Sequence, residues 1–263
     1  MITALGGGVG ASKFLRGLKL ALRGEEFTAI VNTGDDITLY GLRISPDVDT
    51  VIYWLSGVVD RQRGWGQIGD TFRTLEALER FGVETWFKLG DLDLATHIYR
   101  TWLRREGKTP TEIARLIAEA FGVKGATILP MTDADVETWV ETDRGFMHFQ
   151  DYFIRERMKP TVLGVELRGR EEALPAPGVV EAIAASRGVV ICPSNPIISI
   201  GTILSIRGIR EALRNSGVTV VAVSPLVGRK ALKGPADRMM RGLGLEPSSR
   251  QIAKLYMDFL HTM

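Results

Sequence analysis

Short apolar runs that end in glycine-rich or polar turns alternate along the chain with segments of helical spacing. The first two runs, 2–5 and 27–31, end in GGGVGASKF and NTGDD, and Leu15, Leu18 and Leu22 are spaced as on one face of a helix. Apolar runs of four to six residues are typical of parallel strands that are buried on both faces. The pattern therefore predicts an α/β fold, with a Rossmann-like parallel sheet flanked by helices.

The same alternation continues to the end of the chain. Helices are predicted over 52–59, 71–80, 94–105, 111–121, 179–186 and 206–215, with Thr111 as the N-cap of the fourth. Extended segments are predicted over 126–130, 137–142, 160–167, 188–196 and 218–225. Because no repeat or linker marks a boundary, we expect a single domain over 1–263. A partly helical cap, inserted after the second strand, is expected within it over about 50–160.

Composition narrows the class of protein. The chain is 45% hydrophobic and 24% charged, as in folded globular proteins. Its 33 basic and 31 acidic residues leave a net charge of +2, which argues against nucleic-acid binding. One cysteine, Cys192, forms no internal disulfide, which favours a reducing compartment such as the cytoplasm. No apolar run approaches the roughly 20 residues of a membrane span, and no signal peptide is evident, so no membrane partner is expected.

Glycine is in excess, and the excess falls where predicted strands end. The chain has 29 glycines, about 11% of its residues, against roughly 7% in average proteins. Ligands of open α/β sheets bind at the carboxyl ends of strands, where helix N-termini direct their N–H groups. GGGVGASKF at 6–14 is thus either a phosphate cradle or a tight turn without a ligand. The second strand ends in Asn32 instead of an acidic residue, which argues against an NAD-dependent oxidoreductase.

Four carboxylates follow the second strand within 15 residues. Asp35 and Asp36 belong to NTGDD, and Asp47 and Asp49 belong to SPDVDT. Carboxylates near a phosphate loop suit Mg²⁺, which also takes water and phosphate oxygens as ligands. Alternatively, Asp49 caps a helix that begins at Thr50, and Asp35 closes a turn. Their number within so short a segment favours the metal site.

Histidine and cysteine offer little chemistry here. Three histidines and one cysteine are too few and too scattered for a zinc site. We expect His97 in LGDLDLATH to be a polar or core helix residue, and His148 to be packed among aromatic residues. Cys192 lies at the end of an apolar strand with no histidine nearby in the sequence, which favours a buried thiol over a nucleophile.

Two later loops also follow predicted strands. PSNPIISIG carries Ser194 and Asn195, whose hydroxyl and amide suit a phosphate or a sugar. SPLVGRKALKGPADRM carries Arg229, Lys230 and Lys233. Such basic loops either bind phosphate or are simply solvated, and the position after a strand favours binding.

Taken in order, these motifs resemble the 2-phospho-L-lactate transferase family of deazaflavin coenzyme biosynthesis. The resemblance runs from about residue 2 to about residue 245 and rests on GGGVGASKF, NTGDD, SPDVDT, RGWG, LGDLDLATH, HFQDYF, PSNPIISIGTIL and SPLVGRKALKGPADRM. It implies transfer of a 2-phospholactyl or phosphoenolpyruvyl group from lactyl-2-diphospho-5′-guanosine to 7,8-didemethyl-8-hydroxy-5-deazariboflavin (Fo). GMP and coenzyme F420-0 would be the products, Mg²⁺ the cofactor and a homodimer the assembly.

The resemblance also implies the residues of the site. Asp49 and Lys88 match the family's contacts to Fo. Asp35, Asp36 and Asp49 match its metal-binding carboxylates, and Asp35 and Asp49 are the residues expected to be catalytic. The nucleotide and diphosphate are expected to contact Gly7, Gly8, Gly10, Ser12, Asn32, Ser194, Asn195, Lys230, Lys233 and Gly234.

A second function remains open from the sequence. A non-catalytic regulator that binds a nucleotide or a nucleotide sugar, similar to the gluconeogenesis-factor proteins, would share the glycine-loop opening. NTGDD, RGWG, LGDLDLATH and Lys88 favour the transferase. Lactyl, enolpyruvyl and glyceryl donors differ by a few atoms, so the sequence leaves the transferred group open, together with the base of the nucleotide.

Overall fold

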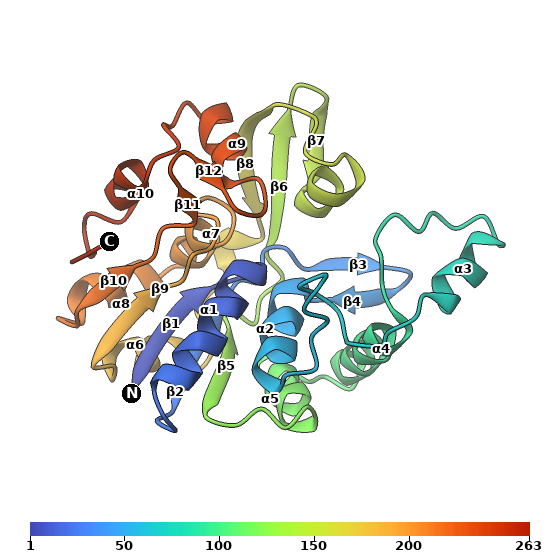
Figure 1. Cartoon of the computed structure of the whole chain (residues 1–263), viewed down its shortest axis with the longest axis horizontal. Coiled ribbons are helices and arrows are strands. Elements are labelled where there is room, and N and C mark those ends of the chain that lie inside the picture. Colours follow the sequence, from blue (N-terminus) through green and yellow to red (C-terminus); the bar gives the residue numbers. More distant parts are fainter.

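A five-stranded parallel sheet lies at the centre of the computed structural model, which describes residues 1–263 (Figure 1). Its strands, in spatial order, are β10 (Val220–Ala222), β9 (Gly188–Ile191), β1 (Ile2–Gly6), β2 (Phe27–Val31) and β5 (Ala126–Pro130). The chain proceeds from β1 through β2 to β5 on one side, and later adds β9 and β10 on the other. The strand order therefore reverses between β1 and β9, and such a switch point is where open α/β sheets bind ligands.

Helices cover both faces of this sheet because its strands alternate between two apolar cores. Ala4, Ala29 and Val31 pack with α1 (Gly8–Ala21), α2 (Pro46–Ser56) and α5 (Pro110–Ala120). Leu5 and Ile30 pack on the opposite face, with α6 (Val179–Ala184), α7 (Ile200–Ser205) and α8 (Ile209–Asn215). The predicted parallel sheet flanked by helices is confirmed.

The predicted insertion after the second strand is also confirmed, and it contains an antiparallel hairpin that the sequence pattern did not reveal. The hairpin is β3 (Ile37–Leu39) and β4 (Leu42–Ile44), and α3 (Arg73–Glu79) and α4 (Asp91–Arg105) follow. Figure 1 shows α3 projecting away from the central sheet. A small separate core supports this part and includes Ile44, Leu75, Phe87 and Leu94.

A second sheet, antiparallel and three-stranded, follows β5. Its order is β7 (Gly145–His148), β6 (Glu137–Thr142) and β8 (Val162–Arg168), with a π-helical turn at Asp151–Arg155 and a 3₁₀ turn at Arg170–Glu172. The chain ends with the β11 (Leu226–Val227) and β12 (Lys230–Ala231) hairpin, α9 (Ala236–Gly242) and α10 (Ser249–Leu255). No helix in the chain combines the length and the apolarity that crossing a lipid bilayer requires.

Several predicted helix starts were wrong. α4 begins at Asp91 and not at 94, α8 begins at Ile209 and not at 206, and the starts of α5 and α2 also differ. α5 is capped by Thr109, whose hydroxyl accepts a hydrogen bond from the Glu112 amide, while the Glu112 carboxylate accepts one from the Thr109 amide. Thr111 instead donates to Asp133 at 2.7 Å. α2 begins at Pro46 and not near 52, because proline is favoured in the first turn of a helix. Because α2 begins at Pro46, Asp47 and Asp49 lie in its first turn, and this decides where their carboxylates point.

Candidate active site

The switch point between β1 and β9 brings the glycine loop against the loop that follows β9. Ser194 Oγ accepts a hydrogen bond from the Gly7 amide at 3.1 Å and lies 2.9 Å from the Gly7 carbonyl, to which it donates. A Cβ atom on Gly10 would collide with the Pro193 carbonyl oxygen. Close packing between two loops therefore requires glycine here, in addition to any approach to a ligand.

The N-terminus of helix α1 faces this switch point. The helix is 14 residues long, and its N-cap is Gly7, which has no side chain of its own to cap it. The free N–H groups at such an end carry a partial positive charge and bind anions. The Asp47 carboxylate lies against the same end, because a Cβ atom on Gly7 would collide with Asp47 Oδ2. Asn32, at the end of β2, donates to that oxygen at 3.0 Å.

Asp35 and Asp47 form a buried acidic pair. Burial raises the pKa of Asp47 to about 7, and hydrogen bonds from Asn32 and Gly8 offset only part of this effect. Burial and the nearby charge of Asp47 raise the pKa of Asp35 well above its ordinary value. Asp35 Oδ1 has no hydrogen-bond partner. Two such carboxylates suit a divalent cation whose remaining ligands are phosphate oxygens and water.

The predicted metal set of Asp35, Asp36 and Asp49 is not assembled in this structure. No three His, Cys, Asp or Glu side chains are gathered as they are in a metal centre. Asp36 accepts a hydrogen bond from Ser45 Oγ at 2.6 Å and lies 3.6 Å from Arg43. Burial raises the pKa of Asp36 to about 6, although Arg43 opposes the shift. Asp36 and Asp49 thus have cationic partners within the fold, whereas Asp35 and Asp47 form no ion pair with a basic side chain.

Asp49 faces away from Asp47, toward helix α4. Its two oxygens are bound by the two terminal nitrogens of Arg100, and the Arg100 Nη1 to Asp49 Oδ2 distance is 2.9 Å. The side chains of both residues are 4% exposed. Residues two apart on a helix do not share a face, so Asp47 and Asp49 cannot both line the glycine loop.

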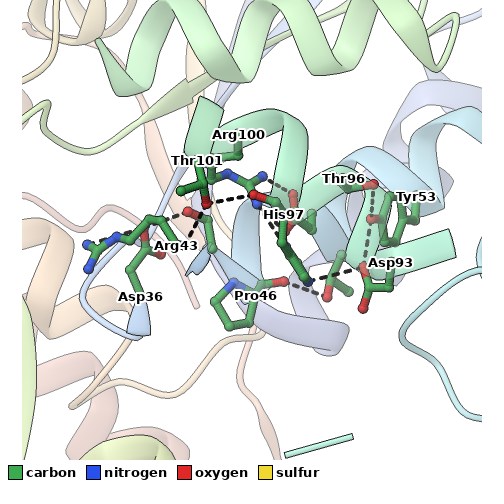
Figure 2. Close-up of polar contacts among 12 residues, drawn as sticks. Asp36, Arg43, Pro46, Tyr53, Asp93, Thr96, His97, Arg100 and Thr101 are labelled. Atoms are coloured by element: carbon green, nitrogen blue, oxygen red, sulfur yellow. Dashed lines mark hydrogen bonds and ion pairs between the residues drawn. The ribbon is translucent and has the colours of Figure 1, made fainter. Parts of the chain in front are cut away.

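A polar network of α4 side chains extends from Arg100 through His97 to Asp93 and reaches Tyr53 (Figure 2). His97 Nδ1 lies 3.1 Å from Arg100 Nη1, and His97 Nε2 lies 3.5 Å from Asp93 Oδ1. Tyr53 donates its hydroxyl to Asp93 at 2.7 Å. Burial alone would raise the pKa of Asp93, but His97 and Tyr53 keep it below its ordinary value. The expectation that His97 is a buried polar helix residue is confirmed.

The cationic residues lie in two parts of the fold, Lys233 at the RGWG loop and Lys88 between α3 and α4. Lys233 Nζ is placed beside Gly64 of the RGWG loop, where a Cβ atom would be 3.3 Å from it and 3.1 Å from Val9. The RGWG loop, the start of α1 and the turn after β12 therefore converge. Lys230 is exposed on β12. Lys88 is 55% exposed between α3 and α4, and it forms an ion pair with Glu79 at 4.0 Å.

Two residues expected at the ligand are turned inward. Ser12 is fully buried and donates to the Gly8 carbonyl within its own helix at 2.8 Å. Asn195 Oδ1 accepts hydrogen bonds from the amides of Ile197 and Ile198, which shapes the loop after β9. Gly234 has a φ of 75°, a conformation that favours glycine, in the turn that follows Lys233.

The structure confirms the predicted roles of His148 and Cys192. His148 is buried, accepts a hydrogen bond from the Gln150 amide at 3.1 Å and packs edge-on against Trp139. Burial lowers its pKa. Gln150 in turn donates to the Asp35 carbonyl at 3.1 Å, so the second sheet supports the acidic turn. Cys192 is 1% exposed, and burial raises the pKa of its thiol.

One functional candidate was missed from the sequence, namely Arg100 as the partner of Asp49. Asp47 was among the four carboxylates noted there, but it was left out of the expected metal set. A signal for Arg100 was present. The polar residues of α4 recur at three- and four-residue intervals on its buried side, at Asp93, Thr96, His97 and Arg100. A buried polar stripe of this kind must find partners on a neighbouring element.

Comparison with known proteins shows the family of this chain. The family model for 2-phospho-L-lactate transferase CofD matches residues 2–260. The 2-phospho-L-lactate transferase of Methanosarcina mazei is 47% identical, over 97% of this chain and 83% of the relative. The phosphoenolpyruvate transferase of Streptomyces coelicolor is 42% identical, over 97% of this chain and 81% of the relative.

Similarity to solved structures concerns the fold alone. The structure of a UPF0052-family protein (BH3568) from Bacillus halodurans is similar with a TM-score of 0.62 at 19% identity. That match covers 93% of this chain and 77% of the other. The family match and the relatives at more than 40% identity over nearly the whole chain establish that this protein belongs to the CofD family of 2-phospho-L-lactate and phosphoenolpyruvate transferases.

Proposed function

We propose that this transferase moves a 2-phospholactyl or phosphoenolpyruvyl group from a guanylylated diphosphate donor to the deazaflavin Fo. GMP leaves and coenzyme F420-0 forms. The reaction is a displacement at phosphorus: the terminal ribityl hydroxyl of Fo forms a new P–O bond, the bond between that phosphorus and the GMP oxygen breaks, and the hydroxyl proton is released. Membership of the CofD family supports the reaction class.

One observation carries the proposal. The N-terminus of α1 and the acidic pair Asp35 and Asp47 meet at the switch point between β1 and β9. The helix end suits the anionic diphosphate, whereas the carboxylates would repel it. A divalent cation between carboxylates and diphosphate removes this conflict, so the arrangement fits a metal–diphosphate complex better than either ligand alone.

We propose Mg²⁺ as that cation, held by Asp35 and Asp47. When bound, it would supply charge neutralisation on the diphosphate and on the leaving GMP. The chain's own groups do the rest of the positioning. The α1 amides and Lys233 hold the phosphates from two sides, and Ser194 fixes the glycine loop through its paired hydrogen bonds to Gly7. Asp49 and Lys88 remain the proposed contacts to Fo.

The competing function is nucleotide binding without catalysis, in the manner of a regulator. The similarity to the UPF0052-family structure supports only a shared fold at 19% identity. Relatives at 42–47% identity are transferases by name. The family match therefore favours the enzyme.

Release of GMP tests the proposal. Purified protein is incubated with Mg²⁺, Fo and lactyl-2-diphospho-5′-guanosine or its enolpyruvyl analogue, and nucleotides are separated by chromatography. We expect GMP to form only when Fo and Mg²⁺ are both present. GMP formation in the absence of Fo would indicate hydrolysis of the donor. Donor binding without any turnover would indicate a regulator.

We also propose that the protein is a homodimer. The resemblance to the family suggested this assembly, and an exposed apolar stripe on α4 supports it. Leu92, Ile98 and Trp102 are 48%, 57% and 55% exposed on one side of the helix. Light scattering coupled to size-exclusion chromatography should give twice the chain mass of 29.0 kDa. A single-chain mass at micromolar concentration would contradict the proposal.

A further inference from the structure

The ion pair between Arg100 and Asp49 is more deeply buried than the other ion pairs that arginine and lysine side chains form. Both side chains are 4% exposed, and the guanidinium binds both carboxylate oxygens. The neighbouring pair of Arg104 and Asp135, one helical turn further along α4, has the same two-pronged geometry with side chains 30% and 58% exposed. Two-pronged binding fixes the plane of a carboxylate as well as its position.

The rest of the α4 network prevents this pair from rotating. His97 lies between Arg100 and Asp93, at 3.1 Å from the first and 3.5 Å from the second. The Tyr53 hydroxyl contacts both Asp93 and Thr96 and comes from α2, the helix that carries Asp49. The two helices are thus joined at two points one turn apart (Figure 2).

The start of α4 is fixed in the same way. The Asp70 carboxylate accepts hydrogen bonds from the amides of Leu92 and Asp93, at 2.8 and 3.1 Å. The Asp91 carboxylate accepts from the amides of Arg73 and Thr74 at the start of α3. This reciprocal capping anchors α4 immediately after the segment that carries Lys88.

We propose that Arg100 is a positioning residue for the acceptor substrate: it holds the Asp49 carboxylate in the orientation that receives a polar hydrogen of Fo. A carboxylate offers about four lone-pair sites, of which Arg100 takes two, so Asp49 retains two sites for further donors. The same arrangement withholds Asp49 from the cation at Asp35 and Asp47. Arg100 therefore acts on Fo binding and not on the metal or the nucleotide. The inference rests on the proposed function, because Asp49 is taken to contact Fo.

The Arg100→Lys variant tests the inference, because lysine keeps the charge and loses the two-pronged geometry. We expect the Kd for Fo, measured from deazaflavin fluorescence, and the KM for Fo to rise by about tenfold or more. The KM for the donor and the Mg²⁺ concentration for half-maximal rate should stay unchanged. Arg104→Lys is the matched control on the same helix and should leave Fo binding unchanged.

A double-mutant cycle keeps the test decisive if Arg100→Lys folds poorly. Removing one partner of a buried pair leaves a charge uncompensated, whereas removing both charges is tolerated better. If Arg100 acts through Asp49, the Asp49→Asn variant and the Asp49→Asn, Arg100→Gln double variant should bind Fo equally weakly. A further loss in the double variant would show that Arg100 acts on Fo independently and would overturn the inference.

The outcomes separate the two proposals. If the wild-type protein binds no Fo, the proposed function fails and the inference fails with it. If the wild-type protein binds Fo and Arg100→Lys, with an unchanged thermal transition, binds it equally well, only the inference fails. A change in the donor KM or in the Mg²⁺ requirement without a change in Fo binding would also overturn it.

Discussion

Asp47 and Asp49 lie two positions apart on α2 and have different partners: Asp47 lies against Gly7 and Asn32, and Asp49 is bound by Arg100. The divergence follows from the helical start at Pro46, which places both residues in the first turn. The two carboxylates are therefore assigned to different substrates. We propose that Asp47 serves the metal and the diphosphate, and that Asp49 serves the deazaflavin.

The Asp47→Asn variant should lose metal-dependent turnover. Asparagine keeps the size of the side chain and removes half of the proposed cation site. We expect kcat to fall by about 100-fold or more, since the metal provides much of the charge neutralisation in phosphoryl transfer. A Mg²⁺ titration at saturating substrates should show a raised requirement. Asp133→Asn, near the N-terminus of α5, is the control, and wild-type Mg²⁺ dependence of the Asp47 variant would contradict the assignment.

The metal-free protein should lose stability as the pH rises from about 5 to about 8. Burial raises the pKa of Asp47 to about 7 and that of Asp36 to about 6. Burial and the nearby charge of Asp47 raise the pKa of Asp35 well above its ordinary value. The folded state therefore binds more protons than the unfolded state in this range. The stability contributed by these three groups is fully present below the ordinary carboxyl pKa and is lost as the pH rises through the raised values. Urea unfolding in EDTA measures this.

Two comparisons check that the acidic pair causes this pH dependence. The Asp47→Asn variant should show a flatter stability profile between the same pH values. Added Mg²⁺ should restore the stability of the wild-type protein at high pH, because a ligand of the folded state stabilises it by mass action. A wild-type stability that rises with pH over this range would contradict the account.

The Gly7→Ala variant should be folded but defective. The new Cβ atom would collide with the Asp47 carboxylate and lie 3.0 Å from the Asn32 Cβ atom, so the acidic pair would be displaced. We expect a loss of stability of about 1–3 kcal/mol from overpacking and a loss of most activity. Gly17→Ala on α1 is the matched control, because its Cβ atom meets nothing within 4 Å. That variant should gain about 0.5–1 kcal/mol in unfolding free energy and keep its activity.

Replacement of the cationic turn should affect the donor alone. The Lys230→Ala, Lys233→Ala double variant removes two charges from the turn that meets the RGWG loop. We expect the KM of the donor to rise about tenfold and its dependence on salt to weaken, while Fo binding is kept. Lys124→Ala is the control. Lys124 precedes β5 and so lies at the amino-terminal end of the strands, whereas the candidate site lies at their carboxyl ends. Loss of Fo affinity in the double variant would place the deazaflavin at this turn instead.

The sheet was predictable from sequence because its strands are short apolar runs, and β2 and β5 match the predicted ranges. The glycine loop and the loop after β9 were also expected at the sheet edge, and Gly7 and Ser194 do meet there. Hydrophobic period alone identifies such elements, and the topology of parallel strands brings their carboxyl ends to one edge. The location of the candidate site could therefore be predicted from the sequence.

The directions in which individual side chains point could not be predicted from the sequence. The start of α2 decides which of Asp47 and Asp49 meets the glycine loop, and a shift of two residues reverses the answer. Arg100 is 51 positions from Asp49 in the sequence, so its role depends on how α4 packs on α2. Ser12 is a similar case, because its hydroxyl turns back to the Gly8 carbonyl instead of toward the loop opening.

The mass of the deazaflavin after reaction tests the central claim most directly. Fo is incubated with the protein, Mg²⁺ and, separately, the lactyl and enolpyruvyl forms of the guanylylated donor, and the deazaflavin is analysed by mass spectrometry. The account predicts that Fo gains one phospholactyl or phosphoenolpyruvyl group with release of an equal amount of GMP, and that Asp47→Asn largely abolishes this product. Unmodified Fo with both donors, under conditions where the donor binds, would contradict it.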